Sequence, residues 1–286
     1  MEFADAVGEA PVAGANVLVH IHIPKSAGTS VSNWLRTAAV TGVISGFRAL
    51  YPDYVYTAGD LGSAGFDDLR LAAVSSHNIQ RFVPTSDGRR LYYFTILREP
   101  LPHFLSALRY MLQERQAFKV PAPIGRTSRD MTAWLLGRPL RAAFRENTQT
   151  NHLALYTWCD ATAGRCDPER YGLWSPRDQA AYERERLEIA KNNLRSFLAV
   201  GTLERLDETL ELVRRRSAAF GLNLPPVAQV PHANVTRVPV DDISWIDNEP
   251  LGKRLLESFA IDQELYAFAK QLLDAARDAS SSPGGR

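Results

Sequence analysis

The segment from His22 to Ser30 combines residue types that can bind a phosphate or sulfate group. Its sequence is His-Ile-Pro-Lys-Ser-Ala-Gly-Thr-Ser. It lies between the apolar stretch 17–23, which predicts a buried strand, and a helical pattern that Thr29 or Ser30 can cap. Backbone N–H groups and the positive end of a helix dipole favour an anion at a helix start. We therefore expect an anion-binding loop here, with Lys25 as its cation.

The order of residues in this loop differs from the general P-loop motif. That motif is G-x-x-x-x-G-K-[ST], with the lysine after the second glycine. In this chain Lys25 precedes Gly28. Taken alone, the segment also fits an exposed loop with a solvated lysine.

Arg98 belongs to a second segment that can bind an anion. It follows the apolar stretch 91–97, which predicts a strand, and open α/β sheets bind ligands at the carboxyl ends of their strands. Its guanidinium can hold a phosphate through two hydrogen bonds, and Ser106 can add a hydroxyl. A metal-dependent kinase would instead place an aspartate at such a strand end to bind Mg²⁺. Pairing with Glu99 is the structural alternative for Arg98.

Together, the two segments resemble the sulfotransferases that use 3′-phosphoadenosine 5′-phosphosulfate (PAPS). The resemblance is to the branch with the heparan-sulfate 2-O and 6-O carbohydrate sulfotransferases and their bacterial relatives. Residues 24–30 are similar to that family's 5′-phosphosulfate loop, P-K-[TS]-x-[GS]-T-[ST], and residues 97–106 to its 3′-phosphate motif, R-[DE]-P-x-x-R-x-x-S. Weaker similarities extend the resemblance over about residues 17–275, at 146–150, 200–208 and 234–236.

The resemblance implies a set of ligands for PAPS as donor and adenosine 3′,5′-bisphosphate as product. Lys25 would contact the 5′-phosphate and the bridging oxygen to sulfur, and Arg98 and Ser106 would bind the 3′-phosphate. The family often has a second arginine at the position of His103, and the sequence leaves open whether Arg109 replaces it. The implied cofactor-binding residues are Lys25, Ser26, Ala27, Gly28, Thr29, Ser30, Arg98 and Ser106.

Sulfuryl transfer to a hydroxyl also needs a general base. His77 follows the predicted strand 72–76, and the family branch places its catalytic histidine in a comparable position. We expect His77 to deprotonate the acceptor as its oxygen attacks sulfur in line, while Lys25 stabilises the leaving phosphate without a metal. His20 and His22 lie inside the first predicted strand, where core histidines are expected.

The elements that position these residues alternate between strand and helix. This order predicts an α/β fold with a central parallel sheet flanked by helices, which the resemblance makes a P-loop-like sulfotransferase fold. We expect a flexible N-terminus over 1–16, one domain over 17–275 and a disordered tail over 276–286. The expected strands are 17–23, 72–76, 91–97 and 197–201, and the expected helices begin near Thr29 and Pro100 and cover 177–195, 206–220 and 249–275.

Charge and cysteine content exclude several classes of protein. The 286 residues include 33 Lys and Arg against 32 Asp and Glu, so there is no general positive field for nucleic acid. Cys159 and Cys166 cannot complete a four-ligand zinc site, and we expect no metal. They permit a disulfide in an oxidising compartment and would be thiols in the cytoplasm. The sequence shows neither a signal peptide nor a membrane span, which favours a cytoplasmic protein.

The acceptor is the least specified part of this prediction. The resemblance favours a hydroxyl on a glycan, whereas a tyrosine, a peptide or a small molecule is the alternative with the same donor. A metal-dependent nucleotide kinase and a non-catalytic nucleotide-binding module are the alternatives from other classes.

Residues 113–147 hold seven Lys or Arg against three acidic residues. This segment either lines a channel for an anionic glycan or forms a solvated surface.

Overall fold

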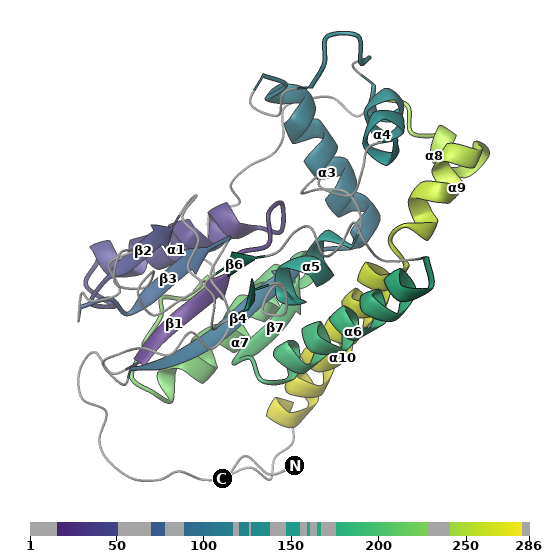
Figure 1. The fold of residues 1–286 in the computed structure, drawn as a ribbon. Coiled ribbons are helices and arrows are strands. Elements are labelled where there is room, and N and C mark those ends of the chain that lie inside the picture. The colour runs from purple at the N-terminus through teal and green to yellow at the C-terminus, as the bar shows by residue number, and fades with distance from the viewer. Residues whose placement is uncertain are drawn as a thin grey trace.

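A parallel five-stranded sheet forms the centre of the molecule (Figure 1). The computed structural model describes residues 16–50, 70–77, 89–116, 120–125, 127–137, 147–154, 159–160, 165–166, 176–227 and 241–281. All neighbouring strands of the sheet are parallel, in the order β2-β3-β1-β4-β7. The strands are β1 (Asn16–Ile21), β2 (Phe47–Leu50), β3 (Ala73–Ser76), β4 (Arg90–Leu97) and β7 (Ala199–Thr202). The predicted α/β class with a central parallel sheet flanked by helices is confirmed.

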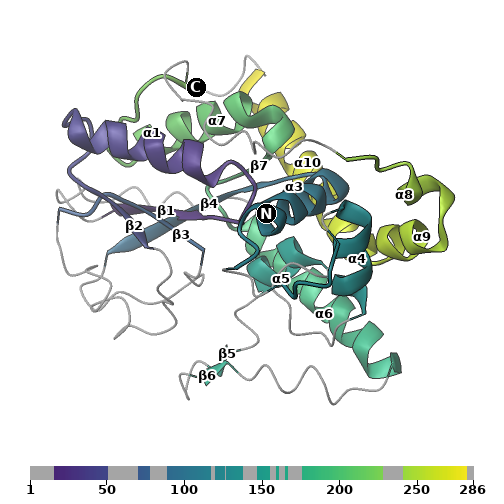
Figure 2. The same ribbon diagram turned by 90° about the horizontal axis from the view of Figure 1, so that it is seen from above.

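The central strand β1 is buried on both faces, as its apolar residues Val17 to Val19 and Ile21 predict. Successive side chains of a strand point to opposite faces. Val17 and Val19 therefore join one hydrophobic cluster, and Leu18 joins another. Figure 2 shows the helices that cover the two faces, with α1 (Gly28–Val40) and α7 (Leu206–Ala218) on one side of the sheet and α5 (Thr148–Ala154) and α6 (Pro176–Arg195) on the other.

A second group of helices lies beyond the end of the sheet at which β4 ends (Figure 1). It is held by its own apolar cluster, which includes Phe104, Leu108, Met131, Trp245 and Leu255. Its helices are α3 (Pro100–Gln113), α4 (Ser128–Leu136), α8 (Trp245–Asn248) and α9 (Pro250–Glu257). The last helix, α10 (Ala260–Ser281), returns along the sheet and packs on α6 and β7.

Several predicted boundaries need correction. The first strand ends at Ile21, and α1 begins at Gly28 with Ala27 as its N-cap rather than Thr29 or Ser30. The strand β2 was not expected from the sequence. The region 249–275 contains α9 and most of α10, and α10 continues to Ser281. The helix therefore includes the first residues of the expected disordered tail, 276–286, whereas residues 1–15 and 282–286 lie outside the described residues.

Two short antiparallel strands, β5 (Cys159–Asp160) and β6 (Arg165–Cys166), form a separate ladder. Their register pairs the backbone of Cys159 with that of Cys166. Among the described residues, no helix combines the length and the apolar composition that crossing a bilayer requires.

Candidate functional site

The carboxyl ends of three adjacent strands bring the predicted site residues to one edge of the sheet. Ile21 of β1 lies opposite Ser76 of β3 and opposite Thr95 of β4. His77 directly follows β3, and Arg98 directly follows β4. The loop from β1 to α1 therefore lies between the two residues that the sequence predicted as base and as 3′-phosphate ligand. Ligands of open α/β sheets bind at this edge.

The backbone of the β1–α1 loop is left-handed at two residues that are not glycine. Lys25 has φ 67° and Ala27 has φ 62°. Such conformations cost about 1–3 kcal/mol each and cluster at functional sites. Residues that alternate between right- and left-handed conformations can direct their N–H groups toward an anion. In this loop the Ser26 N–H is already used, because it donates to the carbonyl of Ile23 (3.2 Å). The helix α1 begins at the next residue, and its cap makes no side-chain hydrogen bond. The N-terminus of a helix favours an anion.

Ser26 buries a hydroxyl at the centre of this loop. Its side chain is 1% exposed, and within the described ranges its Oγ has no hydrogen-bond partner. Leaving a buried hydroxyl unpaired costs about 1–3 kcal/mol. An anion oxygen is an acceptor that can remove this cost, so the serine supports an anion-binding role for the loop.

Position 28 must be a glycine because the His22 ring packs directly against its backbone. A Cβ atom built on Gly28 would lie 1.6 Å from Nε2 of the His22 ring. Every other residue would therefore displace the imidazole. The reason for the glycine is this close approach and not a left-handed backbone, because Gly28 lacks a positive φ.

Two side chains hold the loop from the β4 side. His103 donates a hydrogen bond from Nε2 to the carbonyl of Pro24 (2.7 Å), and Arg98 donates from Nη1 to the carbonyl of Lys25 (3.2 Å). Burial lowers the pKa of His103 to about 4, so this imidazole is neutral at pH 7. His103 thus braces the loop from a buried position.

Arg109 is the residue for which the sequence left a role beside Arg98 open. It is half-buried on α3, and its charge lowers the pKa of Arg98, in addition to the larger lowering by burial. Glu204 acts on Arg98 in the opposite direction. Ser106 lies buried on the same helix, and the described residues include no hydrogen bond between it and Arg98.

Lys25 and Arg98 form a pair of close cations at the loop. Burial lowers the pKa of the Lys25 ammonium, and the positive charge of Arg98 lowers it further. The ammonium lies 4.7 Å from the centroid of the Tyr110 ring, which stabilises it by a cation–π contact. Negative charge bound beside these two cations would offset their repulsion.

The imidazole of His77 has its tautomer fixed by a backbone contact. Its Nδ1 lies 2.8 Å from the carbonyl oxygen of His22. A carbonyl only accepts, so Nδ1 carries the hydrogen and Nε2 carries the lone pair of the neutral ring. Burial lowers the pKa of His77, which keeps the ring neutral at pH 7. His77 therefore has the protonation state that a general base needs.

His20 and His22 were both predicted to lie inside the first strand, which is correct for His20 and wrong for His22, because β1 ends at Ile21. His20 is fully buried, contacts the Ser75 hydroxyl through Nδ1 (2.9 Å) and stacks on Phe94. It is the core histidine that was expected, and burial lowers its pKa to about 3. His22 lies one residue past β1 and stacks its ring on that of His77, with 4.1 Å between centroids.

Sequence reasoning gave no role to three polar residues near the site. Gln149 bonds both backbone groups of Arg98, and Asp262 bonds the backbone of Gln149. His152 lies close enough to His77 for their charges to interact, and burial lowers its pKa to about 4. Gln149 and His152 lie on α5, and the family similarity at residues 146–150 was the one sequence signal that pointed to α5.

Two cations of the basic segment 113–147 make structural contacts. Arg115 donates to the backbone carbonyls of Ile124 (2.7 Å) and Gly125 (3.1 Å). Arg129 forms a bidentate pair with Glu249, with Nε donating to Oε1 (3.0 Å) and Nη2 donating to Oε2 (2.7 Å). For these two residues the structure favours a surface role over an acceptor channel. The other five, Lys119, Arg126, Arg138, Arg141 and Arg145, lie outside the described residues.

Across the part of the chain that the structure describes, no three His, Cys, Asp or Glu side chains are grouped as ligands of a metal ion. Comparison of the chain with protein-family models and with curated protein sequences gives no match.

Proposed function

We propose that this protein is a PAPS-dependent sulfotransferase that transfers a sulfuryl group to a hydroxyl of a carbohydrate. The observation that carries the proposal is the β1–α1 loop, where a left-handed backbone, a helix start and the buried Ser26 hydroxyl converge beside Lys25 and Arg98. Two cations at one loop suit a nucleotide with two separate anionic groups. In this proposal the α/β fold is of the P-loop-like sulfotransferase type.

The donor would bind across the ends of β1 and β4. The loop from Lys25 to Ser30 would hold the 5′-phosphosulfate through its N–H groups and hydroxyls. Arg98 would hold the 3′-phosphate, with Arg109 rather than His103 as the second cation, because His103 already donates to Pro24. Ser106 would add a hydroxyl from α3.

The transfer step would use His77 and Lys25. Nε2 of the neutral His77 takes the proton of the acceptor hydroxyl while the hydroxyl oxygen forms a bond to sulfur. The bond between sulfur and the bridging oxygen breaks, and its electron pair remains on the 5′-phosphate. Lys25 stabilises that charge. The products are a sulfate ester and adenosine 3′,5′-bisphosphate.

Thermal-shift measurements with three ligands test the proposal. Adenosine 3′,5′-bisphosphate should raise the melting temperature more than adenosine 5′-monophosphate does, because only the first carries the 3′-phosphate that Arg98 would bind. ATP with Mg²⁺ is the ligand of the kinase alternative. Stabilisation by ATP with Mg²⁺ alone, or by none of the three, would contradict the proposal.

A pair of lysine variants shows whether binding occurs at the loop. Lys25→Met should abolish most of the shift caused by adenosine 3′,5′-bisphosphate. Lys253→Met is the matched control, since Lys253 is exposed on α9, away from the strand ends. Equal effects of the two substitutions would place the nucleotide elsewhere.

A further inference from the structure

Arg98 is held by a side chain that contacts its backbone rather than its guanidinium. The Arg98 N–H donates to Oε1 of Gln149 (2.9 Å), and Nε2 of Gln149 donates to the Arg98 carbonyl (2.7 Å). One amide thus pairs with both main-chain groups just past the end of β4, as a neighbouring strand would. Gln149 is fully buried. A carboxylate or an apolar side chain cannot make both bonds.

Gln149 is itself held by a buried carboxylate from the last helix. Asp262 of α10 accepts hydrogen bonds from the N–H of Gln149 (3.1 Å), the N–H of Thr150 (2.8 Å) and the Thr150 hydroxyl (2.7 Å). These N–H groups belong to the first turn of α5, whose donors lack partners within the helix. In return, the Asp262 N–H donates to Oδ1 of Asn147 (3.0 Å).

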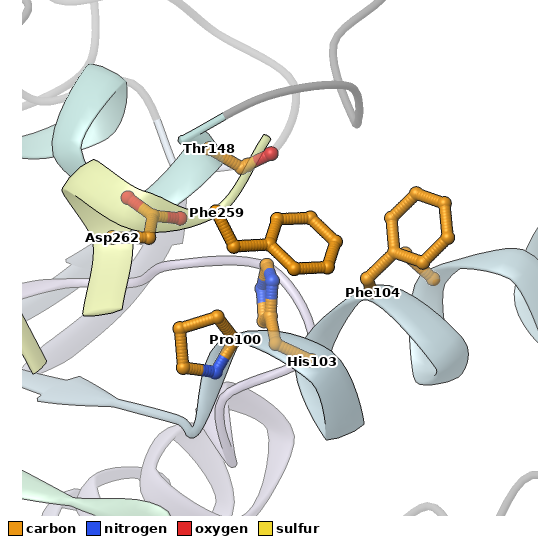
Figure 3. A pocket seen from close by; sticks show the side chains of 7 residues that line it. Pro100, His103, Phe104, Thr148, Phe259 and Asp262 are labelled. Atoms are coloured by element: carbon orange, nitrogen blue, oxygen red, sulfur yellow. The ribbon is translucent and has the colours of Figure 1, made fainter. Parts of the chain in front are cut away.

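Asp262 also lies close to His103, the residue that contacts the β1–α1 loop. Asp262 and His103 both line a cavity of about 10 Å³, which is about the space of one water molecule (Figure 3). Figure 3 shows the side chains around it, contributed by α3, by the start of α5, by Phe259 and by the start of α10. Asp262 is buried and its carboxylate accepts three hydrogen bonds, which hold it in place. From this cavity His103 reaches the β1–α1 loop, where it donates to the Pro24 carbonyl.

From these contacts we infer that Gln149 is a positioning residue that sets the direction of Arg98 toward a nucleotide 3′-phosphate, and that Asp262 holds Gln149 in place. The inference rests on the proposed function and names the determinant of nucleotide selectivity at that site. The Arg98 guanidinium donates to the Lys25 carbonyl. It can reach this carbonyl and a nearby phosphate only if the Arg98 backbone, which Gln149 holds, stays in place. The 5′-phosphate is bound by the loop and depends less on this amide.

Binding of two nucleotides separates this role from a general effect on folding. Gln149→Met keeps the length of the side chain and removes both bonds to Arg98. Calorimetry should show adenosine 3′,5′-bisphosphate binding about tenfold more weakly to the variant, on the scale of one lost charge-assisted contact. Adenosine 5′-monophosphate should bind within about twofold of its affinity for the wild type. Gln113→Met, at an exposed glutamine of α3, is the matched control and should change neither.

The outcomes distinguish this inference from the proposed function. A wild-type protein without preference for the 3′-phosphate would overturn both. A wild-type preference that Gln149→Met retains, or an equal loss for both nucleotides, would overturn only the role of Gln149. If Gln149→Met does not fold, Asp262→Asn provides the second test. With little change in volume it replaces one of the two accepting oxygens by an NH2 group, so the N–H of Gln149 or the donors of Thr150 lose their acceptor, and the same selective loss of adenosine 3′,5′-bisphosphate binding is expected. If neither variant folds, the residues are structural and the inference fails.

Discussion

His103 is a buried imidazole whose replacement by glutamine gives a measurable change in acid stability. Burial lowers its pKa from 6.5 to about 4. The folded state therefore keeps His103 neutral, while the unfolded chain takes up a proton as the pH falls below 6.5. Because the unfolded state then binds more protons, the free energy of unfolding decreases on acidification through this range.

The size of the effect follows from the difference between the two pKa values. Between pH 6.5 and about pH 5, a range of roughly 1.5 pH units, the imidazole is protonated in the unfolded chain and neutral in the folded protein. Each pH unit in this range lowers the free energy of unfolding by about 1.4 kcal/mol. His103 should thus account for about 2 kcal/mol of lost stability between about pH 7.5 and about pH 5. Glutamine does not titrate, and its amide can still donate to the Pro24 carbonyl.

Urea unfolding followed by circular dichroism at several pH values measures this difference. The wild type should lose about 2 kcal/mol more than His103→Gln over the same interval. The buried His20, whose pKa is about 3, is present in both proteins and cancels in the comparison. Curves that remain parallel within about 0.5 kcal/mol would refute the assignment of His103 as a neutral brace of the loop.

Two further substitutions test the site itself. His77→Ala should leave binding of adenosine 3′,5′-bisphosphate intact and lower the rate of transfer from labelled PAPS about 10²–10⁴-fold, and full activity would remove His77 from the mechanism. Since the pKa of His77 is lowered from 6.5, the wild-type rate should be level near neutral pH and fall only at more acidic pH. Gly28→Ala must displace the His22 ring, so the melting temperature should fall by several degrees, as for an overpacked site that costs about 1–3 kcal/mol, and nucleotide binding should weaken. An alanine variant with unchanged melting temperature and affinity would show that the ring moves freely.

The sequence predicted the parts of the site that follow buried strands. His77 and Arg98 come directly after apolar stretches, so the positions of strand ends located them. The strand β2 was missed because Phe47–Leu50 is short and includes an arginine. The cap of α1 was missed because Ala27 adopts a left-handed conformation that its residue type does not predict.

The bracing residues could not be predicted for a different reason. Gln149 and Asp262 are 113 positions apart in the chain, and single polar residues within helices give no periodic signal. His103 stood where the family often has an arginine, and nothing in its neighbourhood indicated a hydrogen bond to a carbonyl 79 positions earlier. Such contacts depend on how elements pack and not on local sequence.

The strand order has a consequence for how the protein acquires its site. The central strand β1 pairs with β3 and β4, whose facing residues lie 55 and 74 positions further along the chain. Pairings of such sequence separation are paid for in loop-closure entropy and slow the folding of a domain. The β1–α1 loop lies near the start of the described chain and is therefore synthesised early. The contact between Gln149 and Asp262, in contrast, requires α10, the last helix described. A nascent chain that still lacks α10 should not distinguish nucleotides by their 3′-phosphate.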